Sequence, residues 1–305
     1  MRYGILKKIH FIVNLIAGAG RCNESFEVIK KRFFSMGIDY TVAYTQYAQH
    51  ATELARQAAA ERKDTVIVAV GGDGTVQEVA KGLLNTGSIM GIMPFGTGND
   101  LARTLCIPID PDGALDVLLG DNILKMDLGD CNGELFLNIA GIGFDSEVVY
   151  ATGKYKRFGK MAYLLGVMET LFRYRGLNLS IDVDGLRVMV DALLIDVANG
   201  AYYGGGMNVA PGANPFDNAF NICVIKKVSI LRFLLWLPKF MKGKHIALND
   251  VLYFNAKDIR VECDRTSKLQ LDGELMSARI LHFKMRKYRQ PIIVGKNVTR
   301  GIVFL

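Results

Sequence analysis

The chain has 305 residues, half of them apolar, with 37 basic and 30 acidic side chains and a formal net charge of +7 at pH 7. Such a chain can bury one large core or two ordinary ones, which excludes intrinsic disorder. The sequence has no Gly-X-Y period, heptad run or internal repeat, so fibrous and solenoid architectures are excluded as well.

The placement of apolar and basic residues indicates a membrane surface rather than a membrane span. No uninterrupted apolar run reaches the ~18–20 residues that a transmembrane helix needs. The two most apolar stretches, Met161–Phe172 and Ile230–Phe240, are interrupted by charges and flanked by Lys and Arg. With an isoelectric point near 9.1, basic residues beside aromatic and Leu-rich runs favour an anionic membrane surface over nucleic acid as a partner. We therefore expect peripheral membrane association and no nucleic-acid binding. The alternative is that these stretches are core helices with solvated ends.

The cysteines indicate a reducing compartment. There are five, widely spaced, with no Cys-x-x-Cys pair and no Cys/His cluster. Neither a disulfide framework nor a zinc site is implied, and we expect a cytoplasmic protein.

Strands alternate with helices through about residue 123. Alternating and β-branched runs predict strands at Lys8–Asn14, Ile38–Thr45, Thr65–Val70 and Ser88–Phe95. Amphipathic and Ala-rich segments predict helices from Ser25 to about Met36, at Gln49–Lys63, at Val76–Leu84 and in a short stretch from Leu101. This order is typical of a doubly wound α/β domain with a parallel sheet.

Beyond that point the pattern changes to hairpins. Asn132-Gly133 and Asp184-Gly185 each separate two alternating segments and accept the positive φ of tight hairpin turns. Strands are predicted at Lys125–Cys131, Glu134–Ala140, Leu177–Val183, Leu186–Ala198, Ala219–Val228, Val251–Cys263, Lys268–Leu271 and Ile280–Lys287, and helices near Lys160–Arg173 and Ile230–Lys242. The sequence thus predicts an α/β domain over residues 1–123 and a mostly antiparallel β-sandwich domain over 124–291, with a last strand at about 292–305 returning to the first domain.

Three glycine-rich turns follow predicted parallel strands, at the sheet edge where open α/β folds bind ligands. They are Asn14–Gly20, Gly71–Thr75 and Gly96–Asp100. Glycines let the backbone approach a ligand closely, and exposed N–H groups at the following helix N-terminus suit phosphate oxygens. A single turn of this kind is explained by chain packing, but three at one edge favour a nucleotide site.

Asp73 and Asp100 each place a carboxylate inside one of these turns. An anion beside a phosphate is repulsive unless a cation bridges the two, which points to Mg²⁺. The alternative is that either side chain caps a helix N-terminus.

The turn Gly71-Gly72-Asp73-Gly74-Thr75 resembles the nucleotide loop of diacylglycerol-kinase-type lipid kinases, of NAD kinases and, more loosely, of phosphofructokinases. The sequence has no P-loop motif, no kinase-type His-Arg-Asp motif and no complete dinucleotide fingerprint. Further segments select among the three families: Gly96-Thr-Gly-Asn-Asp100 with Leu101-Ala-Arg103, Asn138-Ile-Ala-Gly-Ile-Gly-Phe-Asp145, Asn199-Gly200, Gly204-Gly-Gly-Met207, Ala210-Pro211 and Leu271-Asp-Gly-Glu274. With these segments, essentially the whole chain resembles the soluble bacterial diacylglycerol kinase family.

The resemblance implies an ATP-binding α/β domain, a β-sandwich lipid-binding domain and a cleft between them that holds Mg·ATP and a lipid hydroxyl. It implies that Asp272 is the general base, which agrees with the need of phosphoryl transfer for a carboxylate that accepts the hydroxyl proton. We expect this side chain to project freely, although on the residues alone Asp272-Gly273 is a hairpin turn. The implied nucleotide site comprises Asn14, Leu15, Ile16, Ala17, Gly18, Thr45, Gly71, Gly72, Gly74, Thr75, Val76, Gln77, Glu78, Thr97 and Asn99.

The resemblance also implies a structural cation, held by Asp217 with oxygens of its neighbours. The implied cation-site residues are Asn214, Asp217, Ala219 and Glu274. The chain departs from the family here, because Asn214 replaces an acidic residue and Asn218 replaces a glycine. Asparagine tolerates positive φ, so the turn is expected to survive, while the lost charge weakens cation binding.

The sequence is therefore interpreted as that of an ATP- and Mg²⁺-dependent lipid kinase that phosphorylates a primary hydroxyl of a membrane lipid, with diacylglycerol as the default acceptor and phosphatidic acid as the product. An NAD kinase and a nucleotide-binding regulator without turnover are the alternatives, and a homodimer is left open.

Overall fold

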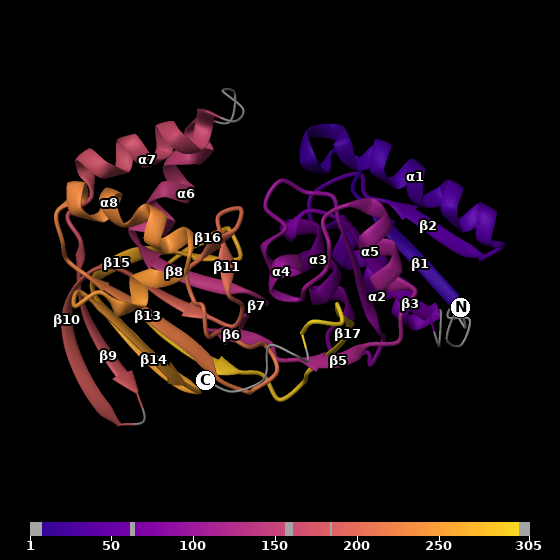
Figure 1. Cartoon of the computed structure of the whole chain (residues 1–305). Coiled ribbons are helices and arrows are strands. Elements are labelled where there is room, and N and C mark those ends of the chain that lie inside the picture. Colours follow the sequence, from indigo (N-terminus) through magenta and orange to yellow (C-terminus); the bar gives the residue numbers. More distant parts are fainter. Residues whose placement is uncertain (1–7, 62–64, 156–160, 184, 299–305) are drawn as a thin grey trace. The chain divides into compact units, whose positions relative to one another are not determined.

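A computed structural model of the chain describes residues 8–61, 65–155, 161–183 and 185–298 (Figure 1). The chain divides into two compact units. The first consists of Met1–Leu128, Gly204–Gly206 and Lys287–Leu305, and the second of Gly129–Tyr203 and Met207–Arg286. Within the described ranges, no helix combines the length and the apolar character that crossing a bilayer requires.

The first unit is built on a six-stranded sheet in the order β2-β1-β3-β4-β17-β5. Its strands are β1 (Lys8–Val13), β2 (Tyr40–Tyr44), β3 (Thr65–Gly71), β4 (Met90–Pro94), β5 (Ile123–Met126) and β17 (Gln290–Ile293). The strands β1 to β4 run parallel, whereas β17 is parallel to β4 and antiparallel to β5. Strand β3 is buried along its whole length, which is why it consists of a continuous apolar run rather than an alternating one.

The helices of this unit cover both faces of the sheet. They are α1 (Arg21–Met36), α2 (His50–Glu61), α3 (Asp73–Leu83), α4 (Asp100–Thr104) and α5 (Pro111–Leu118), with a 3₁₀ turn at Ala17–Gly20. Helix α1 packs with α5, and α2 packs with α3. Because crossovers between parallel strands are right-handed, the strand order places α1 on one face and α2 and α3 on the other. The predicted doubly wound α/β architecture is confirmed.

Two helices of the first unit differ from the prediction. Helix α3 begins at Asp73, three residues before the expected start, because Gly72 is its N-cap and the residues of the glycine turn form its first turn. Helix α5 was not predicted, although its signals are local. Asp110 accepts a hydrogen bond from the N–H of Gly113, and Pro111 occupies the first helical position.

The second unit is a nine-stranded antiparallel sheet in the order β14-β13-β10-β8-β15-β16-β6-β7, with β9 paired to both β10 and β15. The strands are β6 (Gly129–Cys131), β7 (Glu134–Phe136), β8 (Ile139–Gly143), β9 (Leu177–Val183), β10 (Leu186–Ala198), β13 (Phe220–Lys226), β14 (Val251–Ala256), β15 (Asp258–Leu271) and β16 (Glu274–Met285), and a separate ribbon joins β11 (Tyr202–Tyr203) to β12 (Met207–Asn208). Since β8 and β9 each bridge β10 and β15, the sheet closes around an apolar core. The predicted, mostly antiparallel sandwich-like fold is confirmed.

Three helices lie along one side of this sheet: α6 (Phe144–Lys154), α7 (Met161–Arg173) and α8 (Ile230–Met241) (Figure 1). Alternate residues of strand β13 pack into two different apolar cores, one on each face of the sheet. Ile222 and Val224 belong to the core inside the sheet, whereas Cys223 and Ile225 belong to a second core beneath the helices. The helices α7 and α8 occupy the two segments predicted as helical, although residue 160 lies outside the described residues.

Other differences in the second half come from strand boundaries. The expected strand Lys125–Cys131 is two strands, β5 in the first sheet and β6 in the second. The segments expected at 251–263 and 268–271 are β14 and the long β15, which contains a register shift between Glu262 and Ser267. Helix α6 was not predicted. It follows Gly143, whose φ of +110° turns the chain out of β8.

The predicted hairpin turns agree with the structure at the residues it describes. Asn132 and Gly133 both have positive φ and join β6 to β7, and Gly185, also at positive φ, precedes β10 where it pairs with β9. Residue 184 lies outside the described residues. Strand β17 pairs with β4 and β5 of the first sheet, and residues 299–305 are again outside the described part.

Candidate functional site

The turns after β1, β3 and β4 lie side by side in the first unit. The backbone N–H of Asn14 donates to the carbonyl of Val70 at 3.0 Å, and the N–H of Phe95 donates to the carbonyl of Gly71 at 2.8 Å. The side-chain amide of Asn14 donates to the hydroxyl of Thr75 at 3.2 Å, which ties the first turn to the start of α3. The three predicted glycine-rich turns are therefore assembled around one helix N-terminus.

Glycine is required at these turns by close backbone contact. A Cβ on Gly96 would overlap the Cα of Gly72, and a Cβ on Gly18, which has φ +62°, would overlap the carbonyl oxygen of Phe95. These contacts bring the backbone of three loops together next to the positive end of the 11-residue helix α3. Such a surface of backbone N–H groups at a helix N-terminus is suited to phosphate oxygens.

Asp73 holds two of the turns together. Its carboxylate accepts hydrogen bonds from the backbone N–H groups of Asn99 at 2.8 Å, Asp100 at 2.9 Å and Leu101 at 3.4 Å. It therefore caps the N-terminus of α4 from outside that helix. Of the two alternatives for Asp73, helix capping is the one that its contacts display.

Asp100 differs from Asp73 in how its oxygens are used. Its Oδ2 accepts a hydrogen bond from the N–H of Gly205 at 2.9 Å, whereas its buried Oδ1 has no partner among the described residues. Burial raises the pKa of this carboxyl group, and the nearby Arg103 guanidinium opposes that rise. A buried carboxylate oxygen without a donor is a suitable ligand for a cation, so Asp100 fits Mg²⁺ better than Asp73 does.

The described part of the chain contains no group of three or more His, Cys, Asp or Glu side chains able to hold a metal ion. Protein carboxylates alone would therefore not complete a Mg²⁺ coordination sphere at Asp100. Mg²⁺ normally takes one or two carboxylates and completes its sphere with water and substrate phosphates. The donor set thus fits an ion that arrives with a nucleotide.

The other residues predicted for the nucleotide site have mixed surroundings. Ile16, Gly74 and Thr97 are exposed, Leu15, Ala17, Thr45 and Gly72 are half-buried, and Gly18, Gly71, Thr75, Val76 and Gln77 are buried. Two side chains are engaged in local structure. The Glu78 carboxylate accepts from the N–H groups of Gln49 and Ala51 at the start of α2, and the Asn99 side chain closes its own turn against Gly96.

Two residues near Asp100 were not predicted as site residues. Gly205 donates to the carboxylate of Asp100, and the segment Gly204–Gly206 belongs to the first unit although it is far away in sequence. The buried Nε of Arg103 has no partner among the described residues. The run of three glycines at 204–206 was the sequence signal that could have identified Gly205 as a site residue. For Arg103, the signal was its position one helical turn after Asp100.

In the second unit, Asp272 is held by a cradle of backbone amides. Its carboxylate accepts from the N–H groups of Leu137 at 2.6 Å, Asn138 at 2.9 Å and Ile139 at 3.0 Å. The residue has φ +50°, and its own N–H donates to the carbonyl of Ile139 at 3.0 Å. The expectation that the side chain projects freely is wrong, because three donors orient it. Left-handed backbone at a residue other than glycine is uncommon, so the turn is held in place by these bonds.

Two asparagines, Asn138 and Asn199, hold this cradle in shape, and both belong to the sequence segments that resemble those of diacylglycerol kinases. The side-chain amide of Asn138 donates to the carbonyl of Tyr202 at 2.7 Å, and that of Asn199 donates to the carbonyl of Leu137 at 2.6 Å. The N–H groups of Asn199 and Gly200 both donate to the carbonyl of Asn138. These bonds turn the three amides of residues 137–139 toward one carboxylate.

A buried polar network lies behind the Asp272 turn. The Oε1 of Gln270 accepts from the N–H of Gly273 at 2.8 Å, and its Nε2 donates to Asp145 at 3.3 Å. Asp145 and Asp196 are both buried beside Gly141, where any side chain would overlap the Asp145 carboxylate. Burial raises the pKa of Asp145 to about 6, and burial together with the Asp145 charge raises the pKa of Asp196 well above its usual range. Burial therefore favours the neutral, protonated form of both carboxyl groups.

The predicted cation loop keeps its turn. Asn218 has φ +60°, as expected for a residue in the position of a glycine. The Oδ1 of Asn214 accepts from the N–H of Phe216 at 3.2 Å, and that of Asp217 accepts from the N–H of Ala219 at 3.0 Å. The loop itself supplies one carboxylate, and Glu274 is exposed at the start of β16. This donor set is poor for a tightly bound divalent cation.

Comparison with known proteins identifies the family. Residues 8–131 match the family described as the diacylglycerol kinase catalytic domain, and residues 138–286 match the YegS C-terminal NAD kinase beta sandwich-like domain. The chain is 32% identical over 274 residues to a diacylglycerol kinase of Bacillus subtilis, covering 88% of this chain and 90% of that protein. It is 31% identical over 264 residues to a diacylglycerol kinase of Mycobacterium tuberculosis, covering 84% of this chain and 85% of the relative.

The fold agrees with these matches. A crystal structure from Bacillus anthracis, assigned as a diacylglycerol kinase, superposes with a TM-score of 0.79 at 27% identity, covering 95% of this chain and 98% of that one. Both family matches, the identities and the fold cover nearly the whole chain. The chain therefore belongs to the diacylglycerol kinase family of lipid kinases.

Proposed function

We propose that this lipid kinase transfers the γ-phosphoryl group of ATP to the primary hydroxyl of diacylglycerol and so forms phosphatidic acid. The observation that carries the proposal is the assembly of three glycine turns and two aspartates around the N-terminus of α3. The names of the relatives support diacylglycerol as the acceptor. We assign ATP binding to the first unit and lipid binding to the second.

The nucleotide phosphates are proposed to bind the backbone amides of the Gly72 and Gly96 turns, with the side chains of Asn14 and Thr75 at their edge. Asp100 would hold Mg²⁺ through its Oδ1, and Asp73 would position Asp100 by capping α4. Mg²⁺ bound with ATP neutralises charge on the β- and γ-phosphates. Arg103 is placed to add a positive charge beside Asp100.

Asp272 is proposed as the general base that accepts the proton of the lipid hydroxyl. The amides of residues 137–139 fix the orientation of its carboxylate before substrate binds, which lowers the cost of reaching the reactive geometry. Asp73, a carboxylate of the glycine turns, is the alternative candidate for this base. Its oxygens face three backbone N–H groups of the α4 turn, which favours the positioning role over that of a base.

Helix α8 is proposed to carry the enzyme to an anionic membrane surface. One side of this helix is buried through Phe233, Trp236 and Phe240, whereas Leu231 and Leu235 on its other side are each about 70% exposed. Lys239, Lys242 and Lys244 are exposed at the end of the same helix. An exposed apolar face with a basic end is the pattern of a helix that lies in the membrane interface.

A radiolabelled ATP assay over a panel of acceptors in mixed micelles tests the proposed reaction. The panel contains diacylglycerol, phosphatidylglycerol, a long-chain base and soluble NAD. We expect labelled phosphatidic acid. Labelled NADP would support the NAD kinase alternative, and ATP binding without any labelled product would support a nucleotide-binding regulator.

A further inference from the structure

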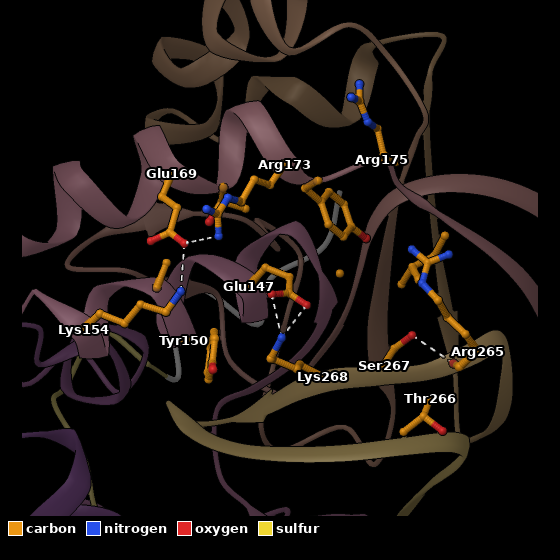
Figure 2. A pocket seen from close by; sticks show the side chains of 15 residues that line it. Glu147, Tyr150, Lys154, Glu169, Arg173, Arg175, Arg265, Thr266, Ser267 and Lys268 are labelled. Atoms are coloured by element: carbon orange, nitrogen blue, oxygen red, sulfur yellow. Dashed lines mark hydrogen bonds and ion pairs between the residues drawn. The ribbon is translucent and has the colours of Figure 1, made fainter.

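A cavity of about 360 Å³ lies within the second unit, and its walls include none of the residues assigned to the nucleotide, the cation or the general base (Figure 2). The walls come from the end of β8, from α6 and α7, from the segment that follows α7, and from β15 around its register shift. A volume in this range is typical of sites for small molecules and exceeds what a bare ion needs.

The walls carry an excess of positive charge. Five basic and two acidic side chains line the cavity: Lys154, Arg173, Arg175, Arg265 and Lys268 against Glu147 and Glu169. The polar lining is completed by hydroxyl-bearing residues, namely Tyr150, Thr170, Tyr174, Thr266 and Ser267. A site with this composition is suited to an anion and unsuited to an apolar ligand.

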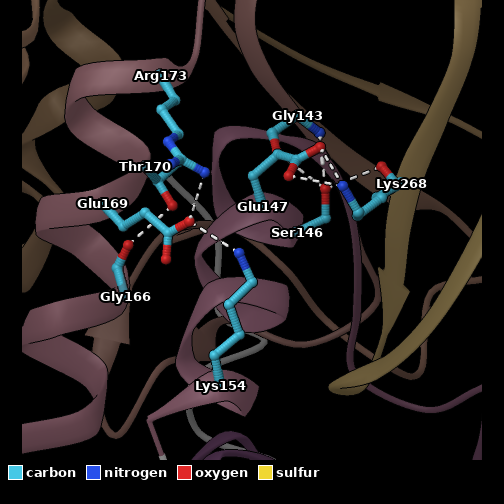
Figure 3. Close-up of polar contacts among 9 residues, drawn as sticks. All are labelled: Gly143, Ser146, Glu147, Lys154, Gly166, Glu169, Thr170, Arg173 and Lys268. Carbon is cyan, nitrogen blue, oxygen red and sulfur yellow. Dashed lines mark hydrogen bonds and ion pairs between the residues drawn. The ribbon is translucent and has the colours of Figure 1, made fainter.

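The two carboxylates are already engaged by three of the cations. Glu169 accepts from Lys154 at 2.8 Å and from Arg173 at 3.1 Å, and Lys268 donates to both oxygens of Glu147 at 2.9 Å (Figure 3). The ammonium groups of Lys154 and Lys268 also lie over the same ring, that of Tyr150, at 5.0 and 4.2 Å from its centroid. These contacts tie α6 to α7 and to β15.

The two remaining arginines, Arg175 and Arg265, line the cavity on the side away from Glu169 and Lys154, and the guanidinium of Arg175 points away from the other labelled side chains (Figure 2). Arg265 donates to the carbonyl of Gly176 at 2.7 Å and pairs with its neighbour Asp264 at 3.2 Å, with its side chain about half exposed. Arg175 is exposed and makes no hydrogen bond or ion pair with the described part of the chain. The buried hydroxyl of Tyr174 likewise has no hydrogen-bond partner there. Of the five cations, Arg175 alone has no acidic partner among the described residues, so its positive charge is the one left uncompensated there.

We propose that this cavity is an accessory binding site for a phosphomonoester dianion. A guanidinium presents paired N–H donors that match two oxygens of a phosphate, and two arginines can engage such a group from different directions. The volume leaves room for a small polar substituent on the phosphate. The phosphomonoester could therefore come from soluble glycerol phosphate or from the headgroup of a lipid phosphate. A dianion held by Arg265 and by Arg175, whose exposed side chain can turn toward it, joins the segment after α7 to β15, and binding therefore stabilises the folded protein.

The binding experiment has one arm for each source. In the first arm, glycerol 3-phosphate is titrated into the enzyme by calorimetry, with the nucleotide site saturated by a non-hydrolysable ATP analogue and Mg²⁺. Uncharged glycerol, and sodium chloride at equal ionic strength, serve as reference titrants. In the second arm, sedimentation compares vesicles that contain phosphatidic acid with vesicles that contain phosphatidylglycerol at matched surface charge. Binding in the first arm identifies a soluble ester as the ligand, and preference for phosphatidic acid in the second identifies a lipid headgroup.

The variants locate the site. Arg175→Gln is expected to weaken binding about threefold or more, and the double change with Arg265→Gln about tenfold or more. The matched control is Lys257→Gln, because Lys257 is an exposed residue of the same unit that does not line the cavity. This variant should leave binding unchanged. If the double variant proves unstable, the single variant Arg175→Gln is sufficient, because this side chain has no hydrogen bond or ion pair with the described residues to lose.

The proposal is overturned if neither arm shows binding, or if the Arg175 and Lys257 variants bind as tightly as the unmodified protein. Because phosphatidic acid is also the proposed product, binding in the second arm is assigned to this cavity only where Arg175→Gln weakens it and Lys257→Gln does not.

Discussion

The carboxylate of Asp73 accepts a hydrogen bond from the backbone N–H of Asp100 at 2.9 Å, so one acidic residue of the glycine turns positions the other. Asp73 faces protein donors, whereas Asp100 keeps a buried oxygen without a partner among the described residues. Two carboxylates that look alike in the sequence therefore have different surroundings, and their substitutions should have different effects.

We expect Asp100→Asn to raise the Mg²⁺ concentration that gives half-maximal activity by about tenfold or more, because the amide is a poorer ligand for a divalent cation. Its effect on stability should be small, because the amide has nearly the same shape as the carboxylate and the buried Oδ1 has no hydrogen-bond partner among the described residues to lose. Mg²⁺ titrations of initial rates, together with thermal unfolding, measure both quantities. Unchanged Mg²⁺ dependence would contradict the assignment.

Asp73→Asn should instead destabilise the first unit by about 1–3 kcal/mol, because an amide nitrogen cannot accept the hydrogen bonds that the carboxylate accepts from the α4 turn. Nucleotide affinity and Mg²⁺ affinity should fall together. Denaturant unfolding and nucleotide titration test this, and an Asp73 variant of normal stability that fails only in turnover would indicate a catalytic role.

Asp272→Asn should lower the rate of phosphoryl transfer by roughly a hundredfold or more and leave ATP affinity near that of the unmodified protein, since a base acts in the transition state. The melting temperature should also fall by a few degrees, because one of the two oxygens in the amide cradle is replaced by a donor. Glu134→Gln, an exposed change at the start of β7 in the same unit, is the matched control. Retained activity in Asp272→Asn would exclude it as the base.

The buried pair Asp145 and Asp196 should make stability fall as the pH rises. A carboxyl group whose pKa is raised in the folded state binds more protons when folded than when unfolded, so the stabilisation is complete below the unfolded value near 3.9 and is lost as the pH rises through the folded value. The pKa of Asp145 is raised to about 6 and that of Asp196 well above its usual range, so the loss begins near pH 4 and extends beyond pH 6.

Asp196→Asn should remove most of this dependence and raise stability at pH 8 by on the order of 1–3 kcal/mol, with little change at pH 4. Denaturant unfolding between pH 4 and pH 8 measures the effect. If the variant and the unmodified protein show parallel pH profiles, the pKa of Asp196 is not raised in the way that its burial implies.

Replacing Lys239, Lys242 and Lys244 by Gln should weaken binding to anionic vesicles at low salt by on the order of a hundredfold, since each basic residue near such a surface contributes about 1 kcal/mol. Activity on a short-chain soluble acceptor and ATP affinity should not change. Vesicle sedimentation at increasing ionic strength measures the effect, because exposed charges are screened by salt.

A matched triple change at Lys257, Lys284 and Lys287, all exposed on other elements, controls for net charge. Equal loss in both triple variants, or equal binding of the unmodified protein to neutral vesicles, would mean that the end of α8 has no special role.

Asn214→Asp should strengthen cation binding in the loop that ends at Ala219, because it adds a carboxylate beside Asp217. We expect Mg²⁺ to raise the melting temperature of this variant by several degrees and that of the unmodified protein much less. Thermal unfolding with Mg²⁺ or with a chelator tests this in the presence of saturating nucleotide, which keeps the first unit loaded. The absence of any Mg²⁺ effect in the variant would argue against a cation site in this loop.

Much of the fold was determined by local sequence. The alternation of strands and helices, the buried run of β3 and the turn Asn132-Gly133 were all correctly predicted. These features depend on the period of apolar residues and on which residues accept positive φ, and both are properties of short segments. The glycine turns were recognised for the same reason, because their composition alone marks a close backbone approach.

The roles of the acidic residues were decided by tertiary structure. Asp73 accepts a hydrogen bond from the amide of Asn99, 26 residues away, and Asp272 accepts one from the amide of Leu137, 135 residues away. The split of one expected strand into β5 and β6, and the gathering of five basic side chains from separate elements around one cavity, also depend on pairings between distant segments. A local pattern shows that a carboxylate or a guanidinium is present, but its hydrogen-bond partners come from segments that only the folded chain brings within about 3 Å.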